Sequence, residues 1–216
     1  MQVAAVLARW KECSTEEQRN SILAGATAAG HNISRAIAEL VETNEGLRQM
    51  ATEDGRSLLL QLGRSPPSDI AIAEVAAAIV RIAAAEGGRE LMGADEVTAM
   101  LVGMGLAAAS DVSRVAVVDA IRAVGGEEKA DLRAVYAAMG RRSGGDAARE
   151  AVARAVARVA EKEAAKSPES RRSGPNVWSD EVEQMLVGLG QRAEGDAARE
   201  AVADAIRFME GVHHPQ

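Results

Sequence analysis

The sequence predicts an all-α protein built from stacked helical repeats, an α-solenoid of about five units, and three observations support this prediction. Residues 95–126 return as residues 180–211 at a constant offset of 85 residues, with MLVG at 100–103 and again at 185–188. Several short apolar segments end in a glycine and are followed by an aspartate at a fixed spacing. Aromatic residues make up only 2% of the chain, so alanine and small aliphatic side chains must fill a core of closely packed helices. Internal repeats of this kind are typical of solenoids.

The N-terminal region predicts three helices before the clearest repeats begin. Residues 3–11 form an amphipathic segment with Trp10 on its apolar side. The sequence Ser-Thr-Glu-Glu at 14–17 is an S-x-x-E capping box, which predicts a helix over residues 15–28. A Gly-His-Asn break at 30–32 then separates this helix from one over residues 33–43.

Four later segments share one pattern, in which an apolar helix ends at a glycine and an aspartate follows six residues later. We expect each glycine to be a left-handed C-cap and each aspartate to be the N-cap of the next helix. The glycines are Gly63, Gly105, Gly140 and Gly190, and the aspartates are Asp69, Asp111, Asp146 and Asp196. The helices expected after them cover 70–83, 112–124, 147–160 and 197–209. A weaker first unit has Gly25 in the glycine position and His31 in the aspartate position.

The spacing of these glycines divides the chain into repeats of roughly 40 residues within one domain, 1–216. The repeats expected are about 15–43, 44–85, 86–126, 127–160 and 176–211. Residues 161–175 are charged and rich in Ser and Pro, without apolar periodicity, so we expect an exposed inserted loop. Ser167 in this loop and Ser65 in another each precede proline and are candidate phosphorylation sites.

The composition argues against several classes of function. The net charge of −7 and pI near 5.2 disfavour a nucleic-acid binder, which usually carries a basic surface. The single Cys13 cannot form an internal disulfide and suits a reducing compartment. No apolar run reaches the roughly 18 residues of a membrane span, and the N-terminus lacks the features of a signal peptide. We therefore expect an intracellular, cytoplasmic location, with a ciliary, cytoskeletal or mitochondrial assembly as the alternative.

Several segments give this pattern a resemblance to the armadillo family of ARM and HEAT-type repeats. The sequence NEGLRQM at 44–50, followed by Asp-Gly at 54–55 and three leucines at 58–60, resembles the family's passage from one repeat into the next. GGRELMGADEV at 87–97 resembles the same passage. The resemblance covers residues 21–209 and implies a right-handed superhelix. It also implies that the third helix of each repeat lines a concave groove that binds other proteins.

The resemblance also indicates which residues line that groove. Aligning the family's A-L-x-N-L motif with this chain places neither the usual Asn ladder nor the usual Trp pockets in the third helices. Because an amide both donates to and accepts from a peptide backbone, its absence argues against an importin-like carrier of basic peptides. The side chains expected on the concave face are Arg35, Glu39, Arg81, Asp119, Arg154, Arg158, Asp204 and Phe208. Among them, Arg81, Arg154 and Arg158 suit an acidic segment of a partner protein.

No pattern in the sequence predicts catalysis, a metal site or a cofactor. Of the three histidines, His31 stands at an expected helix start, where a capping or surface role is expected, and the adjacent His213 and His214 are only a weak metal signal. Gly103-Met104-Gly105 lacks the strand and the third glycine of a dinucleotide fingerprint. We therefore expect a non-enzymatic protein-interaction scaffold or adaptor that uses no cofactor. Two alternatives remain open: a permanent structural subunit of a large assembly, and a chaperone cofactor resembling the armadillo-type Hsp70 exchange factors.

Overall fold

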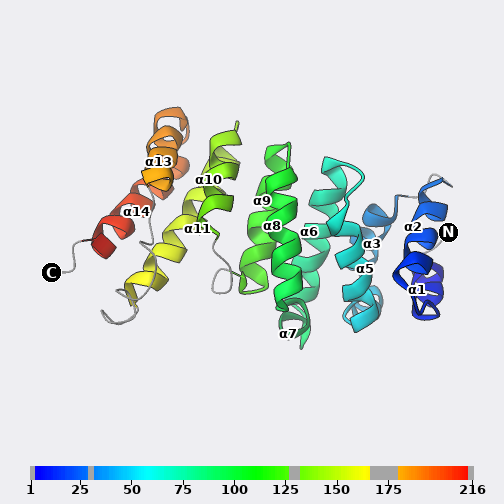
Figure 1. Cartoon of the computed structure of the whole chain (residues 1–216). Coiled ribbons are helices and arrows are strands. Elements are labelled where there is room, and N and C mark those ends of the chain that lie inside the picture. Colours follow the sequence, from blue (N-terminus) through cyan, green and yellow to red (C-terminus); the bar gives the residue numbers. More distant parts are fainter. Residues whose placement is uncertain (1–2, 29–31, 127–131, 166–179, 214–216) are drawn as a thin grey trace.

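The computed structural model describes residues 3–28, 32–126, 132–165 and 180–213 (Figure 1). Within these ranges the regular elements are α-helices, apart from a 3₁₀ residue at Gly126, and there is no strand, which confirms the all-α prediction. The first helices are α1 (Val3–Lys11), α2 (Glu16–Ala28), α3 (Ile33–Leu40), α4 (Asn44–Met50), α5 (Glu53–Arg64), α6 (Asp69–Ala83) and α7 (Gly88–Met92). They are followed by α8 (Asp95–Ala107), α9 (Asp111–Ala123), α10 (Arg133–Arg142), α11 (Asp146–Ala165), α13 (Asp180–Arg192) and α14 (Asp196–His213).

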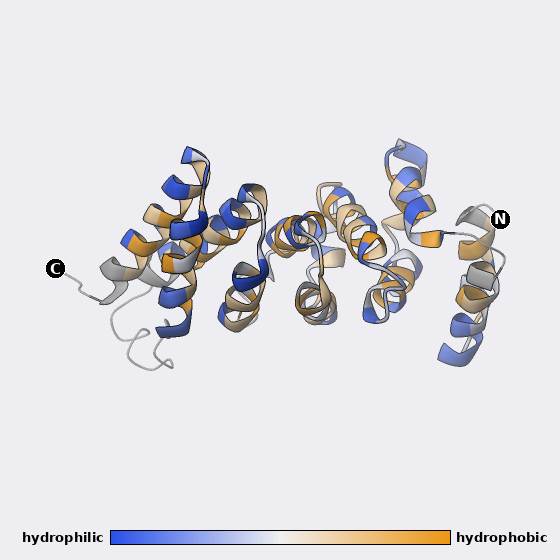
Figure 2. Cartoon of the chain, turned by 90° about the horizontal axis from the view of Figure 1, so that it is seen from above, coloured by the Kyte–Doolittle hydropathy of each residue, from blue (hydrophilic) through white to orange (hydrophobic). Residues whose placement is uncertain are grey.

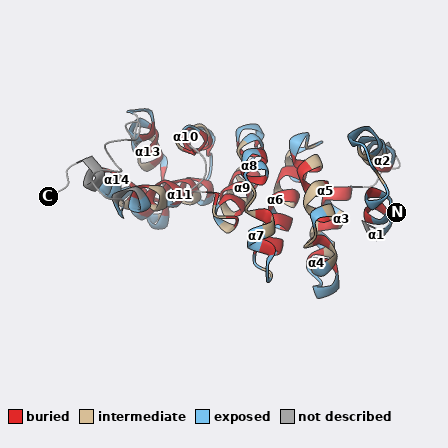
Figure 3. Cartoon of the chain, turned by 60° about the horizontal axis from the view of Figure 1, so that its bottom comes forward, coloured by how far each residue is buried: buried red, intermediate tan, exposed pale blue. Residues whose placement is uncertain are grey.

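The helices pack side by side in two rows. One row runs through α5, α8, α10 and α13, and the other runs through α3, α6, α9, α11 and α14, with each helix packed against its neighbours in the row. Consecutive helices join the rows into the pairs α5–α6, α8–α9, α10–α11 and α13–α14. Figure 3 shows α8, α10 and α13 in one row and α9 and α11 in the other. A pair therefore contacts mainly the pair before it and the pair after it.

The core is a continuous layer of apolar side chains between the two rows. Each helix carries both hydrophobic and hydrophilic residues (Figure 2), and the hydrophobic ones are buried along the whole row of helices. Leu58, Ile79, Leu101, Ile121 and Leu186 are each fully buried. A single helix pair leaves apolar surface exposed on the two sides that face its neighbours. Stacking the pairs buries this surface.

The glycines that close the apolar segments are not C-caps. Gly63, Gly105, Gly140 and Gly190 lie inside α5, α8, α10 and α13, and the only glycines with positive φ among the described residues are Gly87 and Gly125. The physical reason for glycine is close packing, because a Cβ on Gly140 would collide with Sδ of Met185 in the next pair. The C-cap prediction is therefore wrong.

The aspartates that follow are not N-caps either. Asp69 and Asp111 are the first residues of α6 and α9, while Ser68 and Ser110 are the N-caps, with side chains that accept hydrogen bonds from the N–H groups of Ala71 and Ser113. The expected helix positions are nevertheless correct to within one residue at this end. The aspartate side chains are therefore available for another role.

Three smaller predictions are also corrected. The capping box of α2 is Thr15 with Gln18, one residue later than expected, since the Gln18 N–H donates to Thr15 Oγ1 and Gln18 Oε1 accepts from the Thr15 N–H. Helix α3 ends at Leu40, because the Thr43 side chain already caps α4. Helix α11 continues to Ala165, so the first part of the expected insert is helical. The rest of that insert lies outside the described residues.

Candidate functional site

Three of these aspartates accept hydrogen bonds from the following helix pair, and these bonds make a polar seam along one edge of the row. Asp69 accepts hydrogen bonds from the N–H groups of Ala109 at 2.6 Å and Ser110 at 3.2 Å, and from the Ser113 hydroxyl at 2.7 Å. Asp111 accepts from Gly144 and Gly145, and Asp146 accepts from Glu194 and Gly195. In each case the carboxylate binds the two backbone N–H groups that precede the next helix.

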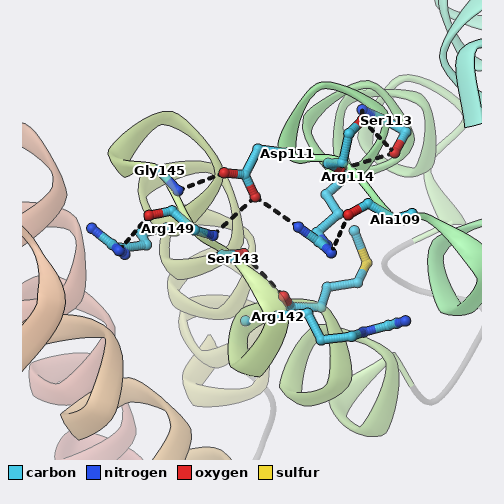
Figure 4. A network of polar contacts seen from close by, with 12 residues as sticks. Ala109, Asp111, Ser113, Arg114, Arg142, Ser143, Gly145 and Arg149 are labelled. Carbon is cyan, nitrogen blue, oxygen red and sulfur yellow. Dashed lines mark hydrogen bonds and ion pairs between the residues drawn. The ribbon is translucent and has the colours of Figure 1, made fainter.

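An arginine one turn later in the helix completes this seam in the second half of the chain. Arg114 donates to Asp111 Oδ1 at 2.7 Å and to the Ala109 carbonyl at 2.8 Å, as Figure 4 shows. Arg149 donates to Asp146 and also to the carbonyls of Gly144 and Arg192. Both arginines are more than nine-tenths buried. Buried charges require such partners, so the seam is a built part of the structure.

The hydrogen bonds of the seam keep its carboxylates ionised. Burial alone would raise the pKa of Asp69, but hydrogen bonds from Ser110, Ala109 and Ser113 outweigh it and lower the pKa to about 2. Burial likewise opposes the lowered pKa of Asp111, which follows from the N–H groups of Gly144 and Gly145 and from Arg114. A carboxylate held in this way acts as a hydrogen-bond acceptor and a link between helix pairs rather than as a general acid.

A shallow groove lies between α9 and α11, on the row that contains the expected binding face. Its volume is about 250 Å³. Charged side chains line its length, with Asp119 and Arg122 on α9 and Glu150, Arg154 and Arg158 on α11. Valine and alanine side chains form the rest of its lining, namely Val115, Val118, Ala147 and Ala151. The groove therefore combines an apolar floor with both signs of charge.

Local ion pairs join four of these five charged side chains. Asp119 pairs with Arg122 at 3.3 Å, and Arg154 pairs with Glu150 at 2.8 Å. Their exposure to solvent makes such pairs weak, since a surface ion pair stabilises a protein by only about 0 to 1 kcal/mol. An incoming polar segment can therefore exchange partners with them at little cost.

The structure brings three of the eight expected binding residues together in this groove: Asp119, Arg154 and Arg158. The other five lie on helices of the same row but do not line it. Arg35 and Glu39 on α3 pair with each other, Arg81 on α6 pairs with Glu42, Asp204 on α14 pairs with Arg207, and Phe208 is exposed near the end of α14. Arg81 is therefore neutralised by a neighbour rather than grouped with Arg154 and Arg158.

Other sequence-based candidates fall outside the groove or outside the described residues. Ser65 is the residue after α5 and is exposed. Ser167, His31 and His214 lie outside the described residues, as does the side chain of His213. In the part of the chain that the structure describes, no group of three or more His, Cys, Asp or Glu side chains is placed to hold a metal ion. Within the same ranges, we find no helix with the length and hydrophobicity of a membrane span.

Sequence reasoning missed both the seam and two of the groove's charged residues. The seam has a signal in the sequence, because Ser68 and Ser110 stand directly before the aspartates and are better N-caps by position. The motif D-x-x-R at 111–114, 146–149 and 196–199 is a second signal. No signal in the sequence indicated Arg122 or Glu150, because their place in the groove depends on how α9 packs against α11.

Comparisons of the chain with protein-family models, with curated proteins and with solved structures found no match.

Proposed function

We propose that the chain is an armadillo-like, right-handed solenoid of about five repeats that serves as a non-enzymatic scaffold or adaptor for another protein. The two rows of packed helix pairs support this architecture, because such pairs contact mainly their neighbours and stack without limit in principle. The resemblance of residues 44–60 and 87–97 to the armadillo passage between repeats supports the choice of family.

The groove between α9 and α11 is the observation that carries the proposed binding site. It gathers Asp119, Arg154 and Arg158, which the armadillo resemblance independently places on the concave face. An extended segment of a partner protein fits this surface, with its apolar side chains over Val115 and Ala151 and its polar groups along the charged rim. Arginine side chains along the rim, those of Arg154 and Arg158 among them, suit a segment with acidic side chains.

Site-specific crosslinking in native extract tests this site. A photoreactive benzoylphenylalanine replaces Ala151 in the groove, and in a matched control it replaces Ala134, an exposed alanine on α10 in the other row. We expect the probe at position 151 to capture one protein partner that the probe at position 134 does not capture. Capture of the same partner from position 134 alone would contradict the proposed face.

Two other functions for the same scaffold are distinguished by the complex it forms. A stoichiometric complex that survives high salt supports a permanent subunit of a large assembly, and a transient complex supports an adaptor. Accelerated nucleotide release from Hsp70 in the presence of the chain would support a chaperone cofactor. An intracellular, cytoplasmic location belongs to this proposal and rests on the single Cys13, which suits a reducing compartment.

A further inference from the structure

Adjacent helix pairs fit together through a glycine in one pair and a large side chain in the next. A Cβ on Gly63 would collide with Met100, and one on Gly140 would collide with Met185. At the middle junction, a Cβ on Gly105 would lie 3.0 Å from Sδ of Met139. Each glycine is therefore a pit that receives a side chain of the pair that follows.

Two more features occur at the same junctions. Three residues before each glycine, close to it on the helix surface, stands an apolar residue that is largely shielded from solvent: Leu60 and Ala137 are buried and Val102 is half-buried. The aspartate six residues after each glycine binds the two N–H groups before the next helix. At each junction, one pair supplies the glycine, an apolar side chain and the carboxylate. The following pair supplies the large side chain that packs on the glycine, here called the knob, and the two N–H donors.

The junction between α3 and α6 shows that the carboxylate and its donors occur together. Ile33 occupies the first position of α3, where the later helices carry aspartate, so no carboxylate stands at this position of the junction. Pro67 occupies one of the two donor positions before α6 and has no N–H group. This junction therefore lacks both the aspartate and one of the two backbone N–H donors. The joint absence indicates that an aspartate at this position is matched by N–H donors on a neighbouring helix pair.

The last pair, α13–α14, carries all three features on its outer face and nothing described covers them. Val187, in the position of Leu60 and Ala137, is 45% exposed. A Cβ on Gly190 would contact only Val202 of its own pair. The Asp196 side chain is fully exposed, whereas the side chains of Asp111 and Asp146 are only about 30% exposed. Arg199 pairs with Asp196 at 3.4 Å, in the same way that Arg149 pairs with Asp146.

From this correspondence we propose that the outer face of α13–α14 is a docking surface for a helical hairpin of another protein. The hairpin carries a Met or Val side chain on its first helix, which fills the pit at Gly190. Two successive backbone N–H groups before its second helix bind the Asp196 carboxylate. This surface continues the interface that joins the internal pairs and is separate from the groove between α9 and α11.

A second copy of this chain does not present the matching surface. In the first pair, α2–α3, the position of Met100 and Met185 is occupied by Asn20, a polar residue whose side chain accepts a hydrogen bond from Gln61 of α5. Helix α1 also packs against α2, α3 and α5 at that end of the row. The α2–α3 pair of a second copy therefore offers no large apolar side chain to pack on Gly190.

The test uses the full chain and, as a probe, a fluorescent peptide of residues 180–213, which is the unit that occupies the equivalent surface of α10–α11. We expect fluorescence anisotropy to show binding, and we expect V187E and D196A each to weaken it by about tenfold or more, equivalent to about 1.4 kcal/mol. The control V112E places the same charge at an exposed valine of α9 and should leave binding unchanged. Unchanged or tighter binding of the V187E and D196A variants would mean that the peptide displaces the resident pair, and would overturn the proposal.

A tandem variant covers the case in which the free peptide does not fold. Residues 166–213 are duplicated after Gln216, and hydrogen exchange is measured at the copied Glu194 and Gly195 amides. We expect these amides to be protected, and we expect D196A in the resident pair to remove the protection. Absence of both peptide binding and amide protection would overturn the docking surface. A dimer of the unmodified chain that V187E dissociates, seen by light scattering, would overturn the choice of partner.

Discussion

Replacing Asp69 by Asn tests the role of the aspartates as links between helix pairs. The Asp69 carboxylate is the first side chain of α6 and accepts three hydrogen bonds from residues of the next pair, those from Ala109, Ser110 and Ser113. Asparagine keeps the size of the side chain but has one neutral acceptor, and its NH₂ group faces a backbone N–H where the second oxygen was. We expect the junction between α6 and α9 to weaken while the helices themselves persist.

The expected loss of stability follows from the hydrogen bonds and the pKa. The lowering of the Asp69 pKa from 3.8 to about 2 corresponds to at most about 2.5 kcal/mol. Solvent screens this partly exposed site and reduces that figure. Loss of hydrogen bonds to a charged acceptor gives a similar range. We therefore expect D69N to lower the free energy of unfolding by about 1 to 2 kcal/mol, or the melting temperature by about 2 to 8 °C for a chain of this size.

Urea and thermal unfolding followed by circular dichroism measure this effect, with D196N as the matched control. Asp196 occupies the same position in the last pair, but among the described residues its carboxylate binds no following pair and pairs only with Arg199 of its own helix. D196N should therefore lose only the helix-dipole contribution and this exposed ion pair, and it should destabilise the fold less than D69N does. Equal destabilisation by D69N and D196N would refute the linking role.

The pH dependence gives an independent check of the same account. Because the folded pKa of Asp69 lies below its unfolded value of 3.8, the ionised carboxylate stabilises the fold above about pH 4, and this contribution is lost as the pH falls toward about 2. The difference in unfolding free energy between the wild type and D69N should shrink over that interval. A difference that stays constant from pH 5 to about pH 2 would show that ionisation of Asp69 is not responsible.

Two further predictions concern the packing and the buried charges. Gly103→Ala should raise the free energy of unfolding by about 0.5 to 1 kcal/mol, because nothing lies within 4 Å of the added Cβ. In contrast, Gly140→Val should lower the free energy of unfolding by about 1 to 3 kcal/mol, because Met185 fills the space that the added side chain would need. Urea unfolding that ranks the two variants in the opposite order would contradict the pit at Gly140. Arg149→Ala should cost about 2 to 3 kcal/mol because it removes charge-assisted hydrogen bonds of a buried guanidinium to Asp146 and to the carbonyls of Gly144 and Arg192. Arg199→Ala at the exposed end should cost less than about 1 kcal/mol. Similar losses for the two arginine variants in the same unfolding assay would count against a buried polar seam.

Local patterns in the sequence predicted the helices well. Apolar periodicity and the position of each aspartate located the starts of α6, α9, α11 and α14 to within one residue. Helix starts depend on local hydrogen bonds and on the sequence next to them, so they can be read without knowing the packing. The number of repeats and the handedness of their stacking stay predictions of the resemblance.

The functions of individual residues in those patterns depended on contacts between distant segments. Gly140 inside a helix and Asp146 at a helix start were interpreted by their most common local roles, as caps. Their actual partners, Met185 and Gly195, are more than 40 residues away in the sequence. The binding face was predicted in part for the same reason, since only the packing of α9 against α11 determines which charged side chains share a groove.

Purification of the chain with its partners from native extract tests the proposed binding groove most directly. The double variant R154E/R158E reverses two of the groove's three positive charges, while the control R48E breaks an exposed ion pair of similar spacing on α4, away from the groove. With both variants folded by circular dichroism, we expect the double variant to lose a partner that the wild type and R48E retain. Retention of every partner by R154E/R158E would contradict the groove as the binding site.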